Sequence, residues 1–257
     1  MSVLEVLAIL AAGMAAGTIN TIVGSGTLVT FPVLLFLGFP PLSANVSNNI
    51  GLVAGGVSGS YGYRHELTGN ARTLRRLMPL SFVGSVIGAA LLLVLPAAAF
   101  KAIVPALIVV ALVLVLVGPR LQAIGAAHHD DDEAAPGWHA WLIGIGVLVA
   151  GMYGGYFGAA QGVLLMGLFS ALSTEPLQRL NGYKNVLSLI VNFVAAIMFV
   201  IFARDQINWL VALLIGIGAF VGGVIGARVG RRIPPTALRG LIILIGVIAI
   251  VKLVWFS

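Results

Sequence analysis

The sequence predicts an all-α polytopic membrane protein built from two inverted repeats of about five helical elements each. The first observation behind this prediction is composition, because 60% of the 257 residues are hydrophobic and only 9% are charged. A soluble domain carries about 25% charged residues, so this chain has too little polar surface to cover a soluble particle. The second observation is a series of long apolar segments, and the third is a pattern that occurs twice.

The repeated pattern consists of a Gly-rich opening, a Pro-Leu pair and a polar helix start. The matching positions are Gly13, Met14, Gly17 and Gly24 with Gly151, Met152, Gly155 and Gly162, then Pro41-Leu42 with Pro176-Leu177, and Asn48-Asn49 with Lys184-Asn185. A duplicated chain that is interrupted at matching places is typical of transporters. We therefore predict a first transmembrane repeat over 1–118, a cytoplasmic linker over 119–137 and a second transmembrane repeat over 138–257.

Ten apolar segments define the elements in chain order. They cover 3–22, 25–38, 44–61, 78–96 and 102–118 in the first repeat, and 138–158, 160–172, 185–203, 208–227 and 236–256 in the second. Most can span about 30 Å of hydrocarbon, which takes about 20 helical residues. Segments 25–38 and 160–172 are too short, and each follows a Gly-rich turn. We expect them to be half-helices or re-entrant segments surrounded by protein or water, although the sequence leaves open whether they cross fully.

Small residues and charge determine how these elements are expected to pack and orient. Gly51, Gly55 and Gly59, and likewise Gly218, Gly222 and Gly226, recur at every fourth residue, a spacing that allows close helix packing. Each repeat has five elements, which is an odd number, so the second repeat starts on the opposite side of the membrane and the two repeats are inverted. In that arrangement eleven basic residues face the cytoplasm and three face outward, whereas parallel repeats of four spans give seven on each side. The cytoplasmic set is Arg64, Arg72, Arg75, Arg76, Arg120, Arg179, Lys184, Arg228, Arg231, Arg232 and Arg239, and the outer set is Lys101, Arg204 and Lys252.

The two Gly-rich turns are the first candidate site. The first turn offers Asn20, Thr21, Gly24, Ser25 and Gly26, and the second offers Tyr156, Gln161 and Gly162. Ser25 or Thr27 is expected to cap the helix that follows. A helix N-terminus at membrane depth presents free N–H groups and a positive dipole end, which suit an anion. The alternative is a tight turn whose polar atoms bind one another.

The third element of each repeat is the second candidate site. Its polar residues are Asn45, Asn48 and Asn49 in the first repeat, and Asn181, Lys184, Asn185, Ser188 and Asn192 in the second. Asn181, Asn185, Ser188 and Asn192 share one helical face, and such a stripe should face protein or water rather than lipid. Lys184 is the cation expected deepest in the second repeat. Its alternative is a lysine whose ammonium extends to the membrane surface.

The chain also lacks several kinds of site. It has no Cys, and its carboxylates lie near segment ends or in loops, so no mid-membrane proton relay is predicted. The linker residues His128, His129 and Asp130 to Glu133 have no metal-ligand spacing and are interpreted as a solvated loop. We find no paired-carboxylate, Ser-His-Asp or phosphate-loop pattern. The sequence therefore predicts no enzyme, no cofactor and no metal, and it favours a transporter or, as the alternative, an anion or small-solute channel.

The residues described above resemble the TauE/SafE sulfite exporter family. The resemblance covers most of the chain and rests on the Gly-rich openings at 13–26 and 151–162, on 44–67 with its Tyr63-Arg64 pair, and on 180–193. It implies export of a small sulfur-containing anion, such as sulfite or the organosulfonate sulfoacetate, across the bacterial inner membrane. The expected partners are this anion and the lipid bilayer, with no nucleic acid, and the oligomeric state stays open.

Overall fold

The computed structural model describes residues 1–127, 137–230 and 235–255, and these form α-helices and two short 3-10 helices without strands. The first half contains α1 (Val3–Ile22), α2 (Thr27–Phe36), α3 (Pro41–Gly62), a 3-10 helix (Arg64–Leu67), α4 (Ala71–Val94) and α5 (Ala97–Ala127). The second half contains α6 (Gly137–Tyr156), α7 (Gln161–Leu172), α8 (Leu177–Phe202), a 3-10 helix (Arg204–Gln206), α9 (Trp209–Val229) and α10 (Pro235–Trp255). Within the described residues, six helices are long and apolar enough to cross a membrane: α1, α4, α5, α6, α8 and α9. The all-α polytopic prediction is confirmed.

Several helices are longer than the apolar segments that predicted them. Helix α3 begins at Pro41 rather than 44, α4 at Ala71 rather than 78, and α8 at Leu177 rather than 185. For α4 and α8 the reason is that hydropathy detects only the apolar part of a helix, whereas their first turns carry arginine, asparagine and lysine. For α3 the difference is three residues, and its first residue is a proline, which is favoured at the start of a helix. Helix α5 also continues to Ala127, inside the segment assigned to the linker. The predicted loop residues 128–133 lie outside the described part of the chain.

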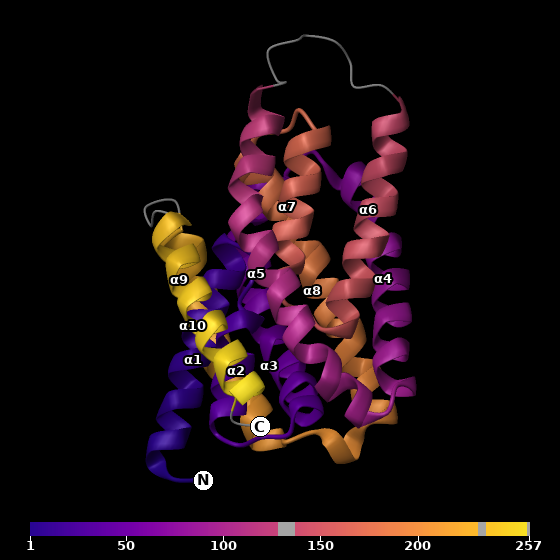
Figure 1. Ribbon diagram of the computed structural model, residues 1–257. Helices are drawn as coiled ribbons and strands as arrows, with labels where there is room; N and C mark the ends of the chain where they lie inside the picture. Colours follow the sequence, from indigo (N-terminus) through magenta and orange to yellow (C-terminus); the bar gives the residue numbers. More distant parts are fainter. Residues whose placement is uncertain (128–136, 231–234, 256–257) are drawn as a thin grey trace.

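The two short helices are re-entrant. Figure 1 shows α1 running inward from one face of the bundle, and α2 returning toward that same face. The pair α6 and α7 does the same from the opposite face. Helix α2 has 10 residues, a length of about 15 Å at 1.5 Å per residue, which is half the thickness of a hydrocarbon core. Neither short helix is long enough to cross a bilayer, and the first helices of the two halves run in opposite directions.

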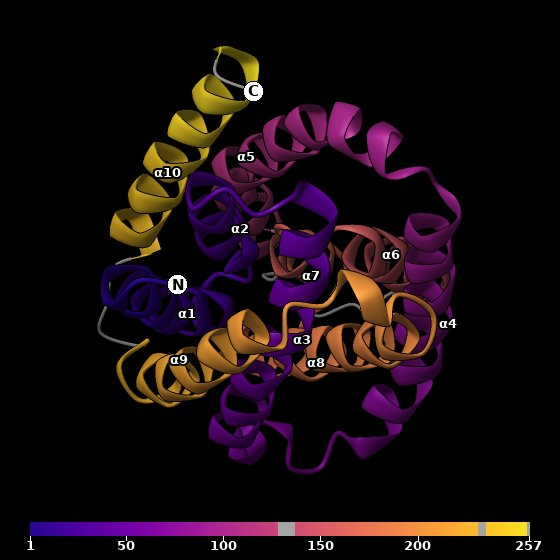
Figure 2. The ribbon, with the colours of Figure 1, turned by 90° about the horizontal axis from the view of Figure 1, so that it is seen from below.

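The two halves use equivalent helix pairs. Helix α9 packs on α1, and α4 packs on α6 (Figure 2). In each pair the two helices run in the same direction (Figure 1). A Cβ atom added at Gly222 of α9 would lie 2.0 Å from the carbonyl oxygen of Met14, and one added at Gly88 of α4 would lie 2.0 Å from that of Met152. Because Met14 and Met152 are matching positions of the repeated pattern, the same glycine contact occurs in each half. The close packing predicted for the stripe of Gly218, Gly222 and Gly226 is confirmed, and the pair Gly84 and Gly88 makes the same kind of contact on α4.

One end of the bundle gathers basic residues, and we call it the basic face. Helix α5 ends and α6 begins there (Figure 1). The connection between α3 and α4 and the last turn of α9 place Arg64, Arg72, Arg75, Arg76 and Arg228 at this end. Lys101 and Arg204 lie toward the opposite face, near the start of α5 and after α8. This distribution is the one that inverted repeats require.

The glycine contacts lead to a stability prediction. Gly222→Ala and Gly88→Ala should each lower the thermal stability of the purified protein in detergent, since overpacking a tight contact costs about 1–3 kcal/mol. The matched control is Gly240→Ala in α10, where an added Cβ has no atom within 4 Å. That control should be neutral or slightly stabilising, because Ala favours helix over Gly. Stability is measured as the fraction of protein that stays monodisperse in size-exclusion chromatography after heating. Equal stability of all three variants would contradict the close helix contacts at Gly222 and Gly88.

Candidate functional site

The two Gly-rich turns cross each other inside the bundle. The backbone N–H of Gly162 donates a hydrogen bond to the carbonyl oxygen of Gly24 at 3.0 Å. A Cβ added at Gly24 would lie 2.4 Å from the Cα of Gly162, and one added at Gly162 would lie 2.5 Å from the Cα of Gly24. Gly24 also has φ +90°, a conformation that glycine adopts without steric cost. The two matching glycines of the repeated pattern are therefore in direct backbone contact.

The turn before α7 has an unusual backbone. Gly158 has φ +77°, and Ala160, the N-cap residue of α7, has φ +60°. Among the described residues Ala160 is the one non-glycine residue with positive φ. Such backbone costs about 1–2 kcal/mol for an L-residue, and conformations of this kind cluster at functional sites. The turn is held in this shape by its surroundings.

The predicted cap of α2 is wrong. Neither Ser25 nor Thr27 caps this helix; Gly26 occupies the N-cap position without a side-chain hydrogen bond. Instead, the Gly26 N–H donates to Asn20 Oδ1 at 3.1 Å, while Thr27 Oγ1 accepts from Asn48 Nδ2 at 3.4 Å. The reason is the sharp return at Gly24, which brings the end of α1 beside the start of α2. Asn20 is thus placed to bind the turn.

Lys184 is buried at the crossing, with only 1% of its surface exposed. Its ammonium Nζ donates to the carbonyl oxygens of Asn20 and Thr21, both at 2.9 Å, and Asn185 Nδ2 donates to the Thr21 oxygen at 3.3 Å. Those carbonyls belong to the last turn of α1, which lacks intrahelical partners and carries the negative end of the helix dipole. The alternative of a lysine reaching the membrane surface is therefore wrong. These two hydrogen bonds use two of the three ammonium protons.

The same kind of contact occurs in the other half. Asn45 Nδ2 on α3 donates to the carbonyl oxygen of Tyr156, the last residue of α6, at 3.1 Å. Each third helix therefore binds the C-terminal end of the opposite half's interrupted helix. Helices α3 and α8 both follow an N-cap proline, Pro40 and Pro176. Asn48 lies eight residues after Pro40, and Lys184 lies eight residues after Pro176, so the two residues occupy equivalent positions in the two helices.

The remaining predicted residues of α3 and α8 differ in their hydrogen bonding. Asn48 pairs with Thr30 of α2, and Asn49 Nδ2 donates to Asn192 Oδ1 at 3.3 Å, joining α3 to α8. Ser188 is only half-buried, and its hydroxyl has no hydrogen bond. Asn48 and Asn49 are therefore engaged with protein.

Several buried polar atoms in the described part of the chain have no hydrogen-bond partner. Near the crossing they are Ser25 Oγ, Gln161 Nε2, Asn181 Oδ1, Asn49 Oδ1 and Ser188 Oγ. A buried polar group without a partner costs about 1–3 kcal/mol, so each of these atoms has capacity for one more hydrogen bond. These atoms lie on both turns and on both third helices.

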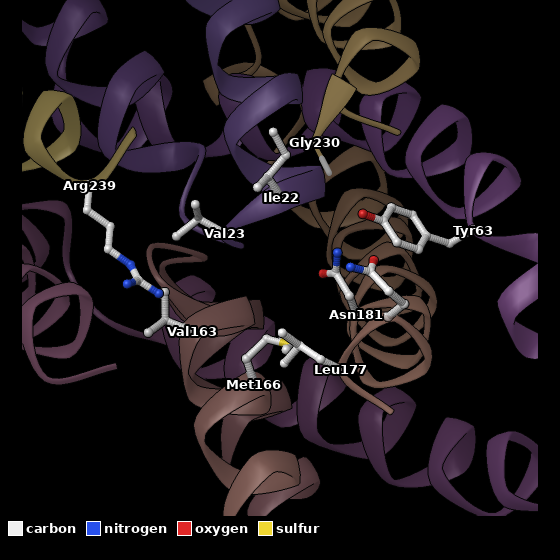
Figure 3. Close-up of a pocket in the computed structure, with 10 residues that line it drawn as sticks. Ile22, Val23, Tyr63, Val163, Met166, Leu177, Asn181, Gly230 and Arg239 are labelled. Atoms are coloured by element: carbon white, nitrogen blue, oxygen red, sulfur yellow. The ribbon is translucent and has the colours of Figure 1, made fainter. Parts of the chain in front are cut away.

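A cavity of about 100 Å³ lies at the end of α1 (Figure 3). Its lining also comes from the ends of α3 and α9 and from the starts of α8 and α10, which are the helix ends on the side of the basic face. Its lining residues are Ile22, Val23, Tyr63, Val163, Met166, Leu177, Gln178, Asn181, Gly230 and Arg239. Of these, only Asn181 was a predicted site residue. Arg239 was interpreted solely as an orientation charge, although a charge inside the 236–256 apolar segment is itself a functional signal. Gln178 precedes the segment assigned to α8 and escaped the apolar pattern.

Toward the opposite face, aromatic side chains close the interior. Phe31 of α2 and Phe157 of the second turn pack edge to face with ring centroids 5.2 Å apart, and Phe100 of α5 lies 6.3 Å from Phe157. All three side chains are buried. The crossing therefore lies between a cavity that contains Asn181, Gln178 and Arg239 on one side and an aromatic cluster on the other.

Comparison with known proteins agrees with this architecture. The family described as sulfite exporter TauE/SafE matches residues 9–253. A probable membrane transporter protein of Haemophilus influenzae is 27% identical over 98% of this chain and 96% of its own length. The probable membrane transporter protein YfcA of Escherichia coli K12 is 25% identical over 95% of this chain and 87% of its own. These names indicate membrane transport, and since the family match spans nearly the whole sequence, this chain belongs to the sulfite exporter TauE/SafE family.

Proposed function

We propose that this protein exports a small sulfur-containing anion, either sulfite or an organosulfonate such as sulfoacetate, across the bacterial inner membrane. The observation that carries the proposal is Lys184, a buried ammonium that binds only backbone carbonyls in the described structure. The ion pair found among the described residues joins Arg179 to Glu175, so no carboxylate neutralises this lysine. Burying an unpaired charge costs several kcal/mol, and a bound anion would offset that cost.

The chemistry around Lys184 suits an oxyanion with several acceptor oxygens. The third ammonium proton, the free Nε2 of Gln161 and the hydroxyl of Ser25 are donors on three different elements. Charge-assisted hydrogen bonds of this kind are about twice as strong as neutral ones. A sulfite or sulfonate group presents three oxygens and can bind all three donors together. The geometry favours an oxyanion in general, and the family description, sulfite exporter, is the reason for proposing one that contains sulfur.

The distribution of space around the crossing favours alternating access over a channel. The cavity lies on the side of the basic face, whereas the cluster of Phe31, Phe100 and Phe157 fills the opposite side. A transporter closed on one side has this asymmetry, and a conducting channel needs a continuous path. The repeats at 1–118 and 138–257 would rock against each other around the crossing.

Flux through purified protein tests this proposal. Proteoliposomes should show saturable counterflow of labelled sulfite or sulfoacetate. An imposed inside-negative potential should speed efflux, since it favours anion exit by about 2.3 kcal/mol per charge per 100 mV. Unsaturable flux without counterflow would instead indicate the channel alternative. Absence of flux for every sulfur anion would overturn the proposed function.

A further inference from the structure

We propose that the cavity at the basic face is a second anion site, which receives the anion before it reaches Lys184, and that Arg239 recognises it there. The identification of this anion as a sulfur-containing one rests on the proposed function. The cavity itself rests on separate observations. It lies where the end of α1, the start of α7, the start of α8 and the start of α10 come together.

Arg239 supplies the positive charge of this cavity. It comes from α10, and Figure 3 shows its guanidinium extending into the space beside Val163. It is the one charged residue among the lining side chains, so no carboxylate competes for it in the cavity. A guanidinium presents a rigid fork of N–H donors that binds two oxygens of one anion at once. A cavity of about 100 Å³ also exceeds the space that one water molecule needs.

Two amides across the cavity have unused hydrogen-bonding capacity. Asn181 points into the cavity from the side opposite Arg239 (Figure 3), and it is only 8% exposed. The Oδ1 of Asn181 and the Oε1 of Gln178 have no hydrogen-bond partner. Buried amides are normally paired, and each amide carries two N–H donors for an anion as well as an acceptor for its water. The Arg239 guanidinium and the two amide NH2 groups are therefore donors that line one space, and the unpaired amide oxygens can accept from water there.

The cavity leads directly to the crossing. Asn181 lies three residues before Lys184 and four before Asn185 on α8, so the three side chains are neighbours on the helix surface. On α1, Ile22 and Val23 line the cavity immediately after Asn20 and Thr21, whose carbonyls bind Lys184. An anion held between Arg239 and Asn181 is thus one helical turn from the buried ammonium. The two cations form successive sites along one path from the basic face.

A single cysteine in the cavity wall can report this charge without any transport. The chain has no Cys, so Met166→Cys introduces one thiol at a lining position. Two methanethiosulfonate reagents of opposite charge, sulfonatoethyl and trimethylammonioethyl, are applied to inside-out vesicles. We expect the anionic reagent to react faster relative to the cationic one, and sulfoacetate to slow both reactions. Sulfite is unsuitable as the protecting anion because it cleaves the mixed disulfide that the reagent forms.

Substitution of Arg239 then decides its role. In the Met166→Cys background, Arg239→Gln should lower the ratio of anionic to cationic rates about tenfold, the size expected for losing a charged hydrogen bond. Arg239→Lys should retain part of the preference, and it also serves if the Gln variant fails to insert. The matched control is Arg75→Gln, an exposed arginine at the same face, which should leave the ratio unchanged.

The outcomes separate this inference from the proposed function. If wild-type protein carries sulfoacetate but the rate ratio ignores both Arg239 substitutions, Arg239 has no role in the cavity and the inference is overturned. Equal effects of Arg75→Gln and Arg239→Gln would overturn it as well, because the charge would then act through the general surface potential. If the ratio depends on Arg239 but no sulfur anion is transported, the cavity is an anion site and the proposed function fails.

Discussion

Lys184→Met is expected to abolish anion transport while leaving the protein folded in the membrane. The substitution keeps a long side chain in the buried space but removes the ammonium that binds Asn20 and Thr21. Losing a hydrogen bond to a charged ligand costs about 1.5–3 kcal/mol, so affinity should fall tenfold or more. Replacing an unpaired buried charge by an apolar group is often tolerated, which preserves the fold. Lys101→Met makes the same change at an exposed position and should transport like the wild type.

The measurement must separate ligand binding from a purely structural contact with α1. We suggest thermal unfolding of purified protein with increasing sulfoacetate, because a ligand stabilises the state that binds it in proportion to affinity and concentration. Wild-type and Lys101→Met proteins should be stabilised by the anion, and Lys184→Met should not. If Lys184→Met unfolds at a lower temperature but gains the full stabilisation from sulfoacetate, Lys184 only supports α1. The anion site would then lie elsewhere.

Gly24→Ala should have the second large effect, an almost complete loss of stably folded protein. The added Cβ would lie 2.4 Å from the Cα of Gly162, and both partners are backbone atoms that cannot rotate away. The matched control is Gly38→Ala, because Gly38 has a similar φ of +84° but no atom within 4 Å of an added Cβ. The control therefore reports only the cost of the left-handed backbone, about 1–2 kcal/mol. The difference between the two variants measures the contact at the crossing.

Yield of monodisperse protein and counterflow activity are the two readouts for this pair. Gly38→Ala should be somewhat less thermostable than wild type but active. Gly24→Ala should give little monodisperse protein, and any that is recovered should be inactive because the two turns are pushed apart. Similar yield and activity for both variants would mean that the turns do not need to touch for function.

The local character of the chain could be predicted from sequence alone. Low charge and long apolar runs identify membrane helices, because transfer into hydrocarbon is a property of each segment by itself. The lengths of segments 25–38 and 160–172 predicted half-helices, and the asparagines of α3 and α8 were identified as an interior face. The predicted starts of α4 and α8 were several residues too late, because hydropathy identifies only lipid-compatible residues and these helices begin with arginine or asparagine.

The partners of these residues were decided only by the tertiary structure. Nothing local to Lys184 indicates that its ammonium binds carbonyls at the end of α1, more than 160 positions earlier in the chain. The same holds for Asn20, which displaces Ser25 and Thr27 at the start of α2, and for Arg239, which enters a cavity formed by four helices. The physical reason is that a hydrogen bond or cavity depends on where whole helices cross. The repeated glycines permit that crossing, but only packing determines which polar groups meet there.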